Sequence, residues 1–190
     1  MSAADGQPSR VRTIAVIGAG VAGRGFALAC AAAGFHVALE DVMPSNLRRA
    51  EAEFADLGDA AGRLELARTV EDAVRDADIA VDFVPDELES KLEIFSLIDR
   101  MAPPKTIICT PSEALSITDL ASCVYRPERC VAVRGRLAGA GPLRVLYPDG
   151  VAPETLKAVE DLLRALGTEP RMEPDPDAPV LMKNLLRKSL

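Results

Sequence analysis

The chain has 190 residues, of which 48% are apolar and 27% are charged. This length can bury one sizeable core but is too short for two domains of ordinary size. Acidic residues outnumber basic ones by 29 to 22, and the net charge of −7 argues against nucleic acid or an anionic membrane surface as a partner. Residues 1–10 carry no apolar stretch of signal-peptide length, and no apolar run approaches the ~20 residues that span a bilayer, so we expect a cytoplasmic protein.

Short apolar strands alternate with helices from residue 11 onward. A β-branched strand ends at Gly18, an alanine-rich helix follows over Val21–Ala33, and a second strand covers Phe35–Leu39. The same criteria predict further helices at 44–57, 70–75, 88–101, 117–124 and 154–166, and further strands at 63–67, 79–84, 105–109, 130–133 and 143–147. This alternation predicts a single α/β domain, doubly wound in the Rossmann manner, with a mainly parallel sheet covered on both faces.

The last part of the chain departs from this alternation. Residues 1–172 are expected to form the domain, and the proline and acidic residues of 173–179 predict a linker. Residues 180–190 return to an apolar, basic pattern typical of a helix. That helix would either cap the sheet of its own chain or present an apolar face to a partner subunit or a second copy.

Four cysteines lie far apart in the sequence, at Cys30, Cys109, Cys123 and Cys130. None forms a Cys-x-x-Cys pair, and at least the first two fall inside apolar stretches. We therefore expect buried free thiols and no metal site.

A glycine motif links the first strand to the first helix. Gly18, Gly20 and Gly23 are spaced as Gly-x-Gly-x-x-Gly, with Val21 and Ala22 between the last two. In this context the amides of the motif face a pyrophosphate at the positive end of the helix. The first glycine makes the turn, the second lets the backbone approach the phosphates, and the third lets the helix pack against the strand.

Asp41 follows the second strand, 18 residues beyond the last glycine of the motif. A carboxylate at this place accepts hydrogen bonds from both ribose hydroxyls and repels a 2′-phosphate, which favours NAD over NADP. The alternative is a glycine turn kept for packing alone, with a merely solvated Asp41.

Several motifs resemble those of the 3-hydroxyacyl-CoA dehydrogenases and lie in the same order. They are Val16–Gly25, Val84–Lys91, Leu115–Leu120, Ala152–Thr155 and Leu166–Pro170. The resemblance covers nearly the whole chain as the NAD-binding first domain of that family. Residues 179–186 resemble the entry into the family's second, helical domain, with Asn184 at its asparagine position.

The resemblance also implies cofactor contacts beyond the glycine motif. In that family the stretch matching Val84, Pro85, Asp86 and Lys91 passes under the cofactor, and Thr110 ends the next strand. For Lys91 the alternative is a solvated charge on a helix.

Catalysis in the family resembles a histidine–glutamate dyad assisted by a serine and an asparagine. Here Glu113 stands at the serine position with Ser112 beside it, Arg134 stands at the histidine position, and residues 143–147 contain no glutamate. The single histidine, His36, begins the second strand, on the adenine side. The dyad is therefore predicted to be absent, and the candidate catalytic residues are Ser112, Glu113, Arg134 and Asn184.

Arginines suggest what kind of substrate such a site would take. Arg134, Arg136 and Arg144 fall near the expected substrate position, and guanidinium groups bind carboxylate or phosphate well. These arginines therefore suggest a small anionic substrate. The alternative is that they are solvated loop residues without a ligand. The family's helical insertion that contacts CoA is reduced here to about 46–62, which argues against acyl-CoA recognition.

Three functional hypotheses follow from the sequence. The first is an NAD(H)-binding, diverged oxidoreductase of this family without its usual catalytic residues. The second is a non-catalytic sensor or scaffold in which NAD stabilises the fold. The third is one half of a split dehydrogenase, completed by a partner chain that supplies the helical domain and the base.

Overall fold

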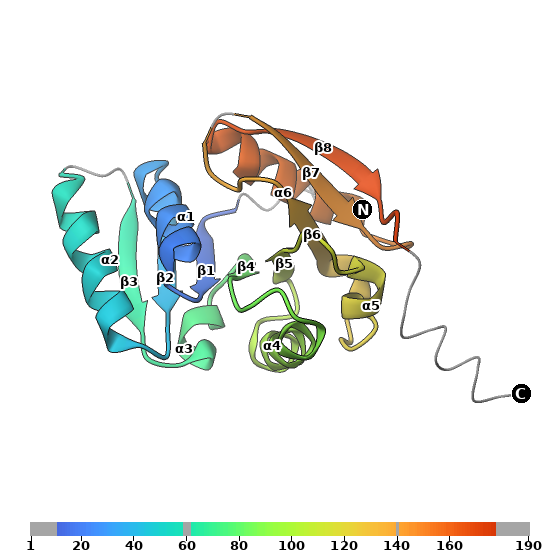
Figure 1. Ribbon diagram of the computed structural model, residues 1–190, viewed down its shortest axis with the longest axis horizontal. Coiled ribbons are helices and arrows are strands. Elements are labelled where there is room, and N and C mark those ends of the chain that lie inside the picture. The colour runs from blue at the N-terminus through green and yellow to red at the C-terminus, as the bar shows by residue number, and fades with distance from the viewer. Residues whose placement is uncertain (1–10, 59–61, 140, 178–190) are drawn as a thin grey trace, which may run out of the picture.

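The computed structural model describes residues 11–58, 62–139 and 141–177, which form one eight-stranded sheet with helices on both faces (Figure 1). The strands are β1 (Thr13–Ile17), β2 (His36–Glu40), β3 (Arg63–Ala67), β4 (Ile79–Asp82), β5 (Ile107–Pro111), β6 (Cys130–Arg134), β7 (Pro142–Tyr147) and β8 (Glu169–Pro174). The helices are α1 (Val21–Ala32), α2 (Pro44–Asp56), α3 (Val70–Val74), α4 (Leu88–Met101), α5 (Ile117–Ala121) and α6 (Pro153–Ala165), with a 3-10 turn η1 (Pro127–Arg129).

The strand order is β3-β2-β1-β4-β5-β6-β7-β8. The first six strands run parallel, β7 is antiparallel to β6, and β8 is parallel to β7. The chain winds outward from β1 to β3 and then returns to place β4 on the other side of β1. This reversal opens a crevice at the carboxyl ends of β1 and β4, where doubly wound sheets bind their ligands. The predicted fold class is confirmed.

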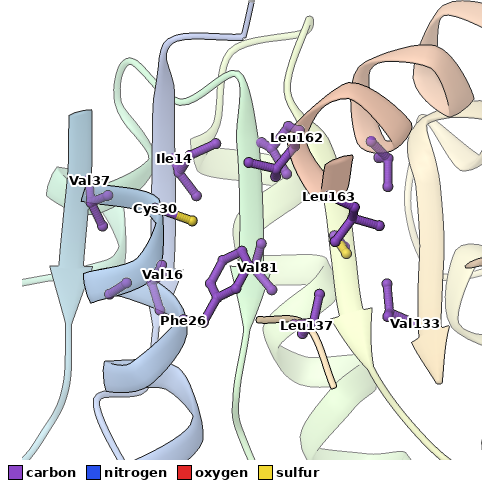
Figure 2. Close-up of a cluster of buried hydrophobic side chains, with 14 of the residues drawn as sticks. Ile14, Val16, Phe26, Cys30, Val37, Val81, Val133, Leu137, Leu162 and Leu163 are labelled. Carbon is purple, nitrogen blue, oxygen red and sulfur yellow. The ribbon is translucent and has the colours of Figure 1, made fainter. Parts of the chain in front are cut away.

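Two layers of apolar side chains hold the helices to the sheet. One layer joins the sheet to α1, α2 and α6, and the other joins it to α3, α4 and α5. Figure 2 shows the first layer, in which Phe26 and Cys30 from α1 and Leu162 and Leu163 from α6 lie over Val81 and its neighbours in the sheet. The strands are apolar on both faces because helices cover both, as a buried parallel sheet requires.

The linker predicted from residue 173 is wrong at its start, because Glu173 and Pro174 belong to the edge strand β8. This strand pairs in parallel with β7, in register Arg144↔Arg171, and Glu173 bonds the guanidinium of Arg144. Prolines disfavour central strands, but an edge strand tolerates them because one row of its amides forms no ladder bonds. The pattern of prolines and charges therefore concealed the strand. The helix predicted over 180–190, with Asn184, lies outside the described residues.

Within the described ranges, no helix is both long and apolar enough to cross a membrane. The four thiols are free, as the sequence predicted, and burial is confirmed for Cys30, Cys109 and Cys130, whereas Cys123 is half-buried. The same residues contain no cluster of three or more His, Cys, Asp or Glu side chains that could hold a metal ion.

Candidate functional site

The candidate site lies at the carboxyl edge of the parallel strands. Five loops meet there, because parallel strands all end at the same edge of the sheet. They follow β1 at Gly18, β2 at Asp41, β4 at Phe83, β5 at Ser112 and β6 at Gly135.

The three glycines of the motif meet three different surroundings. Gly18 has φ +100°, a conformation that other residues rarely adopt. A Cβ on Gly23 would come 1.9 Å from the carbonyl oxygen of Gly18, so this glycine is needed for the helix to pack on the loop. A Cβ on Gly20 would meet nothing within 4 Å, and its backbone (φ −60°, ψ −176°) suits any residue. The protein itself therefore gives no steric reason for a glycine at position 20.

The amino end of α1 opens toward this empty space. Gly20 is the N-cap, it offers no side-chain cap, and the first turn carries no acidic residue. The first amides of a helix have no partners within the helix, and they carry the positive end of its dipole. A phosphate group fits here because it supplies the missing acceptors and needs the room that Gly20 leaves.

Asp41 binds the glycine loop directly. Its carboxylate accepts hydrogen bonds from the amide of Ala19 at 2.6 Å, the amide of Met43 at 2.6 Å and the side-chain amide of Asn46 at 3.1 Å. Two carboxylate oxygens offer about four acceptor positions. Asp41 therefore fixes the loop and still retains capacity for a ribose hydroxyl.

Two hollows flank the loop after β4. The first, of about 450 Å³, includes Gly18, Asp41, Val84 and Pro85 in its lining. The second, of about 690 Å³, lies between the start of α1 and the β6–β7 loop, and its lining includes Val21, Ala22, Val84, Pro111, Arg136 and Leu137. Most of the residues predicted to contact the cofactor thus line one continuous edge of the molecule.

Lys91 and Thr110 do not line either hollow. Lys91 is fully buried, and its Nζ donates to Oδ1 of Asp82 at 2.7 Å. The hypothesis of a solvated lysine is therefore wrong, because α4 turns this side chain inward against β4. Burial raises the pKa of the Asp82 carboxyl, and the charge of Lys91 opposes that rise. The side chain of Thr110 is also buried.

Three of the predicted catalytic residues come together at the ends of β5 and β6. Their side chains form hydrogen bonds to the backbone of the loops that follow these two strands. The Ser112 hydroxyl accepts from the amide of Leu115, and the Glu113 carboxylate accepts from the amide of Gly135 at 3.1 Å. The amide of Glu113 donates to Asp86 at 3.0 Å, so Asp86, a predicted cofactor contact, fastens this loop.

Arg134 is held from three sides. Its guanidinium pairs with Asp177 and donates to the carbonyl oxygens of Ser112 and Leu115, each at 3.4 Å. Arg144 bonds Glu173, whereas Arg136 is exposed and makes no ion pair with any described residue. Of the three arginines, Arg136 alone lines the second hollow without an ion pair to the part of the chain that the structure describes.

His36 lies at the opposite edge of the sheet. It begins β2, and its Nε2 is 3.2 Å from a carboxylate oxygen of Glu65. The strand separates this imidazole from the loops at the carboxyl edge.

Comparison with known proteins agrees with this geometry. The model of the 3-hydroxyacyl-CoA dehydrogenase NAD binding domain matches residues 13–134, which include all six parallel strands. The chain belongs to the 3-hydroxyacyl-CoA dehydrogenase family. Its cofactor is NAD, and the glycine loop, the start of α1 and Asp41 fit that group as described above.

Relatives in this family differ in their named substrates. The chain is 30% identical over 138 residues to a probable 3-hydroxybutyryl-CoA dehydrogenase of Bacillus subtilis, covering 65% of this chain and 48% of that protein. It is 31% identical over 175 residues to an L-carnitine dehydrogenase of Burkholderia mallei, covering 85% and 54%. The chain thus spans about half the length of the curated relatives that it matches.

Solved structures of the family share this fold. A crystal structure of 5-formyl-3-hydroxy-2-methylpyridine 4-carboxylic acid 5-dehydrogenase, described as an NAD⁺-dependent dismutase, superposes with a TM-score of 0.75 at 28% identity, covering 94% of this chain and 64% of that one. The (S)-3-hydroxybutyryl-CoA dehydrogenase PaaH1 of Ralstonia eutropha gives a TM-score of 0.79 at 23% identity, covering 92% and 68%. The latter likeness concerns the fold alone.

Two aspartates that shape the site carried no signal in the sequence. Asp175 caps the start of α5 by accepting from Ser116 and Thr118, and Asp177 pairs with Arg134. Both lie in the stretch interpreted as a linker, and only their pairing with distant residues shows their role. Glu40, which the sequence places beside Asp41 as an added negative charge, is buried in the lining of the first hollow.

Proposed function

We propose that this chain is the NAD(H)-binding part of a diverged oxidoreductase that works without the histidine–glutamate dyad of its family. The empty space at Gly20 carries the binding part of this proposal, because an unconstrained glycine is explained by a ligand that needs the room. Asp41 would receive the ribose, the amides at the start of α1 would receive the pyrophosphate, and the second hollow would receive the nicotinamide.

The end of β6 supports the catalytic part. Bound NAD supplies the hydride acceptor or donor of the reaction. A proton has to be moved as well, and the family's imidazole position holds Arg134, which carries no basic lone pair at neutral pH and is paired with Asp177. Residues 143–147, where the family's glutamate would orient the base, contain no glutamate. An unpaired Arg136 at the second hollow favours a substrate with a carboxylate or phosphate.

Binding is tested by titrating NADH and NADPH, followed by nicotinamide fluorescence and calorimetry. Saturable NADH binding is expected, with NADPH at least about tenfold weaker because Asp41 and Glu40 repel a 2′-phosphate. Gly20→Val should lower the melting temperature by only about 2–4 °C, because valine is a poorer N-cap residue, and should weaken NADH by at least about 100-fold, since its side chain fills only ligand space. Ala32→Val, at the exposed far end of the same helix, is the matched control and should bind normally. Unchanged binding by Gly20→Val would refute the proposed site.

Turnover separates the catalytic alternatives. Activity with a 3-hydroxy acid or its thioester that survives His36→Gln, with no inflection near the ordinary histidine pKa of ~6.5, supports a diverged oxidoreductase. Loss of turnover in a well-folded His36→Gln variant would contradict it. NADH binding without turnover would favour a sensor or scaffold, and turnover only after adding a helical partner chain would favour a split enzyme.

A further inference from the structure

The first hollow has the shape and chemistry of a site for a flat base. Its walls are mostly apolar and come from the loops after β2 and β4 and from α3 and α4, including Val42, Val70, Pro85, Ile94 and Leu97. Asp41, the expected ribose position, stands at one side. A purine attached to that ribose would be sandwiched by apolar surface, so any discrimination between purines must come from the few polar groups in the lining.

Glu40 is the polar group placed to do this. It ends β2, its residue is only 7% exposed, and it lines the hollow. Alternation along the strand places it on the same face as Ala38, toward α3, whereas Asp41 turns to the glycine loop. None of the hydrogen bonds or ion pairs among the described residues involves the Glu40 carboxyl. A nearly buried acidic side chain thus faces the hollow without a partner.

Such a carboxyl is costly to keep in a fold unless something binds it. Burial and the nearby charge of Asp41 both raise the pKa of Glu40, which means that the charged form is disfavoured there. A hydrogen bond from a ligand would offset this cost, and an apolar residue would pack better if no ligand came. The side chain is therefore better explained by a ligand than by the packing.

We propose that Glu40 reads the edge of the adenine of the bound dinucleotide, by accepting a hydrogen bond from its 6-amino group. The inference rests on the proposed NAD(H) site and adds selection of the base to it. A carboxyl group has an oxygen that accepts this bond whether it is ionised or neutral, and the neutral form can also donate to a ring nitrogen. Against the ionised carboxylate, a purine with a 6-oxo group would instead turn an acceptor toward an acceptor.

The charges around the hollow agree with this selection. Asp41 after β2 and Glu93 on α4 are the other ionisable groups in its lining, and none of the described lysines or arginines lines it. The lining therefore attracts an amino group and repels a carbonyl oxygen. Glu93 is exposed, so water screens its effect more than it screens that of Glu40.

The test compares NADH with reduced nicotinamide hypoxanthine dinucleotide, which differs only in carrying a 6-oxo purine. The wild-type chain is expected to prefer NADH by about 10- to 100-fold, as for one charge-assisted hydrogen bond that the analogue cannot make. Glu40→Gln keeps the size of the side chain and gains an amide donor for the 6-oxo oxygen, so the preference should fall to within about threefold or reverse. Glu93→Gln removes a charge from the same hollow and should keep the wild-type preference.

The outcomes separate this inference from the site on which it rests. The proposed recognition of adenine by Glu40 is overturned if the wild-type chain binds both dinucleotides equally, or if Glu40→Gln keeps the wild-type preference. Neither result contradicts the NAD(H) site itself. Failure of the wild-type chain to bind either dinucleotide overturns the site and the inference together. The wild-type comparison needs no variant, so it decides the matter even if Glu40→Gln folds poorly.

Discussion

Replacing Lys91 by methionine should be among the most damaging single changes in this domain. Lys91 and Asp82 form an ion pair at 2.7 Å whose side chains are 1% and 0% exposed. Removing the lysine keeps the volume of the side chain but leaves the carboxylate buried without its cation, which typically costs about 3–5 kcal/mol. For a domain of this size that corresponds to a fall in melting temperature of roughly 6–20 °C.

The loss should depend on pH in a definite direction. Without Lys91, the pKa of Asp82 rises further, because the charge and the hydrogen bond of the lysine no longer oppose the effect of burial. The folded state then binds a proton that the unfolded state releases, so the stability of Lys91→Met falls as pH rises through the window between the unfolded and folded pKa. We expect a larger deficit against wild type at pH 8 than at pH 5.

Guanidinium unfolding followed by circular dichroism measures both effects in a chain without tryptophan. Lys105→Met is the matched control, since Lys105 pairs with Asp78 at the surface with 59% of its side chain exposed, and it should cost no more than about 1 kcal/mol. The double variant Asp82→Leu/Lys91→Met should recover at least about 2 kcal/mol relative to Lys91→Met. A loss below about 1 kcal/mol in Lys91→Met, or one equal at both pH values, would refute this reasoning.

Three further predictions concern the core and the buried acids. Glu40→Gln should stabilise the protein at pH 8 and much less near pH 4, because the raised pKa of Glu40 makes wild-type stability fall as the pH rises between these values. Urea unfolding at both pH values checks this prediction, and an equal effect of the substitution at the two pH values would contradict it. A thiol reagent at pH 8 should label the half-buried Cys123 first and the other three cysteines only on unfolding, since burial raises the pKa of those three, that of Cys109 to about 12. Rapid labelling of two or more cysteines in the folded protein would contradict this prediction. Phe26→Ala should lower the free energy of unfolding by about 3–5 kcal/mol, because this buried ring packs between α1 and the sheet, and denaturant unfolding measures the loss. A loss below about 1 kcal/mol would contradict this prediction and would mean that the core collapses around the gap.

The fold could be predicted from the sequence where the hydrophobic periodicity and the residues that end helices and strands indicate the same element. The helix at 88–101 and the strand at 63–67 match the structure in both bounds, and most other elements differ by one to three residues. The exception is β8, where Pro170 and Pro174 and alternating charges resemble a linker. Its pairing with β7 is a long-range contact, and at a sheet edge such a contact outweighs local propensity.

Only part of the site could be predicted from the sequence, because a local motif specifies the local backbone geometry and not the partners from distant segments. The spacing of the glycines and Asp41 fixes a strand, a turn and a helix start, so their arrangement followed from the sequence. Lys91 was predicted on the right helix, but its inward turn depends on Asp82, which carried no signal of its own. The partners of Arg134 and Glu113 come from chain segments 43 and 22 residues away, and no single-sequence pattern specifies such pairings.

The two parts of the carboxyl edge use their polar groups differently, and this difference directs the search for chemistry. At the glycine motif the amides starting α1 have no side-chain cap, so a ligand gains hydrogen bonds without breaking any. At the ends of β5 and β6, Ser112, Glu113 and Arg134 already satisfy groups of the protein. A substrate placed there would have to break these bonds, each worth about 0.5–1.5 kcal/mol net or more where charged. The second hollow has no such cost, and its unpaired Arg136 offers a binding group. If this chain retains redox chemistry, its substrate should therefore depend on Arg136 and the β6–β7 loop more than on the positions where the family keeps its dyad.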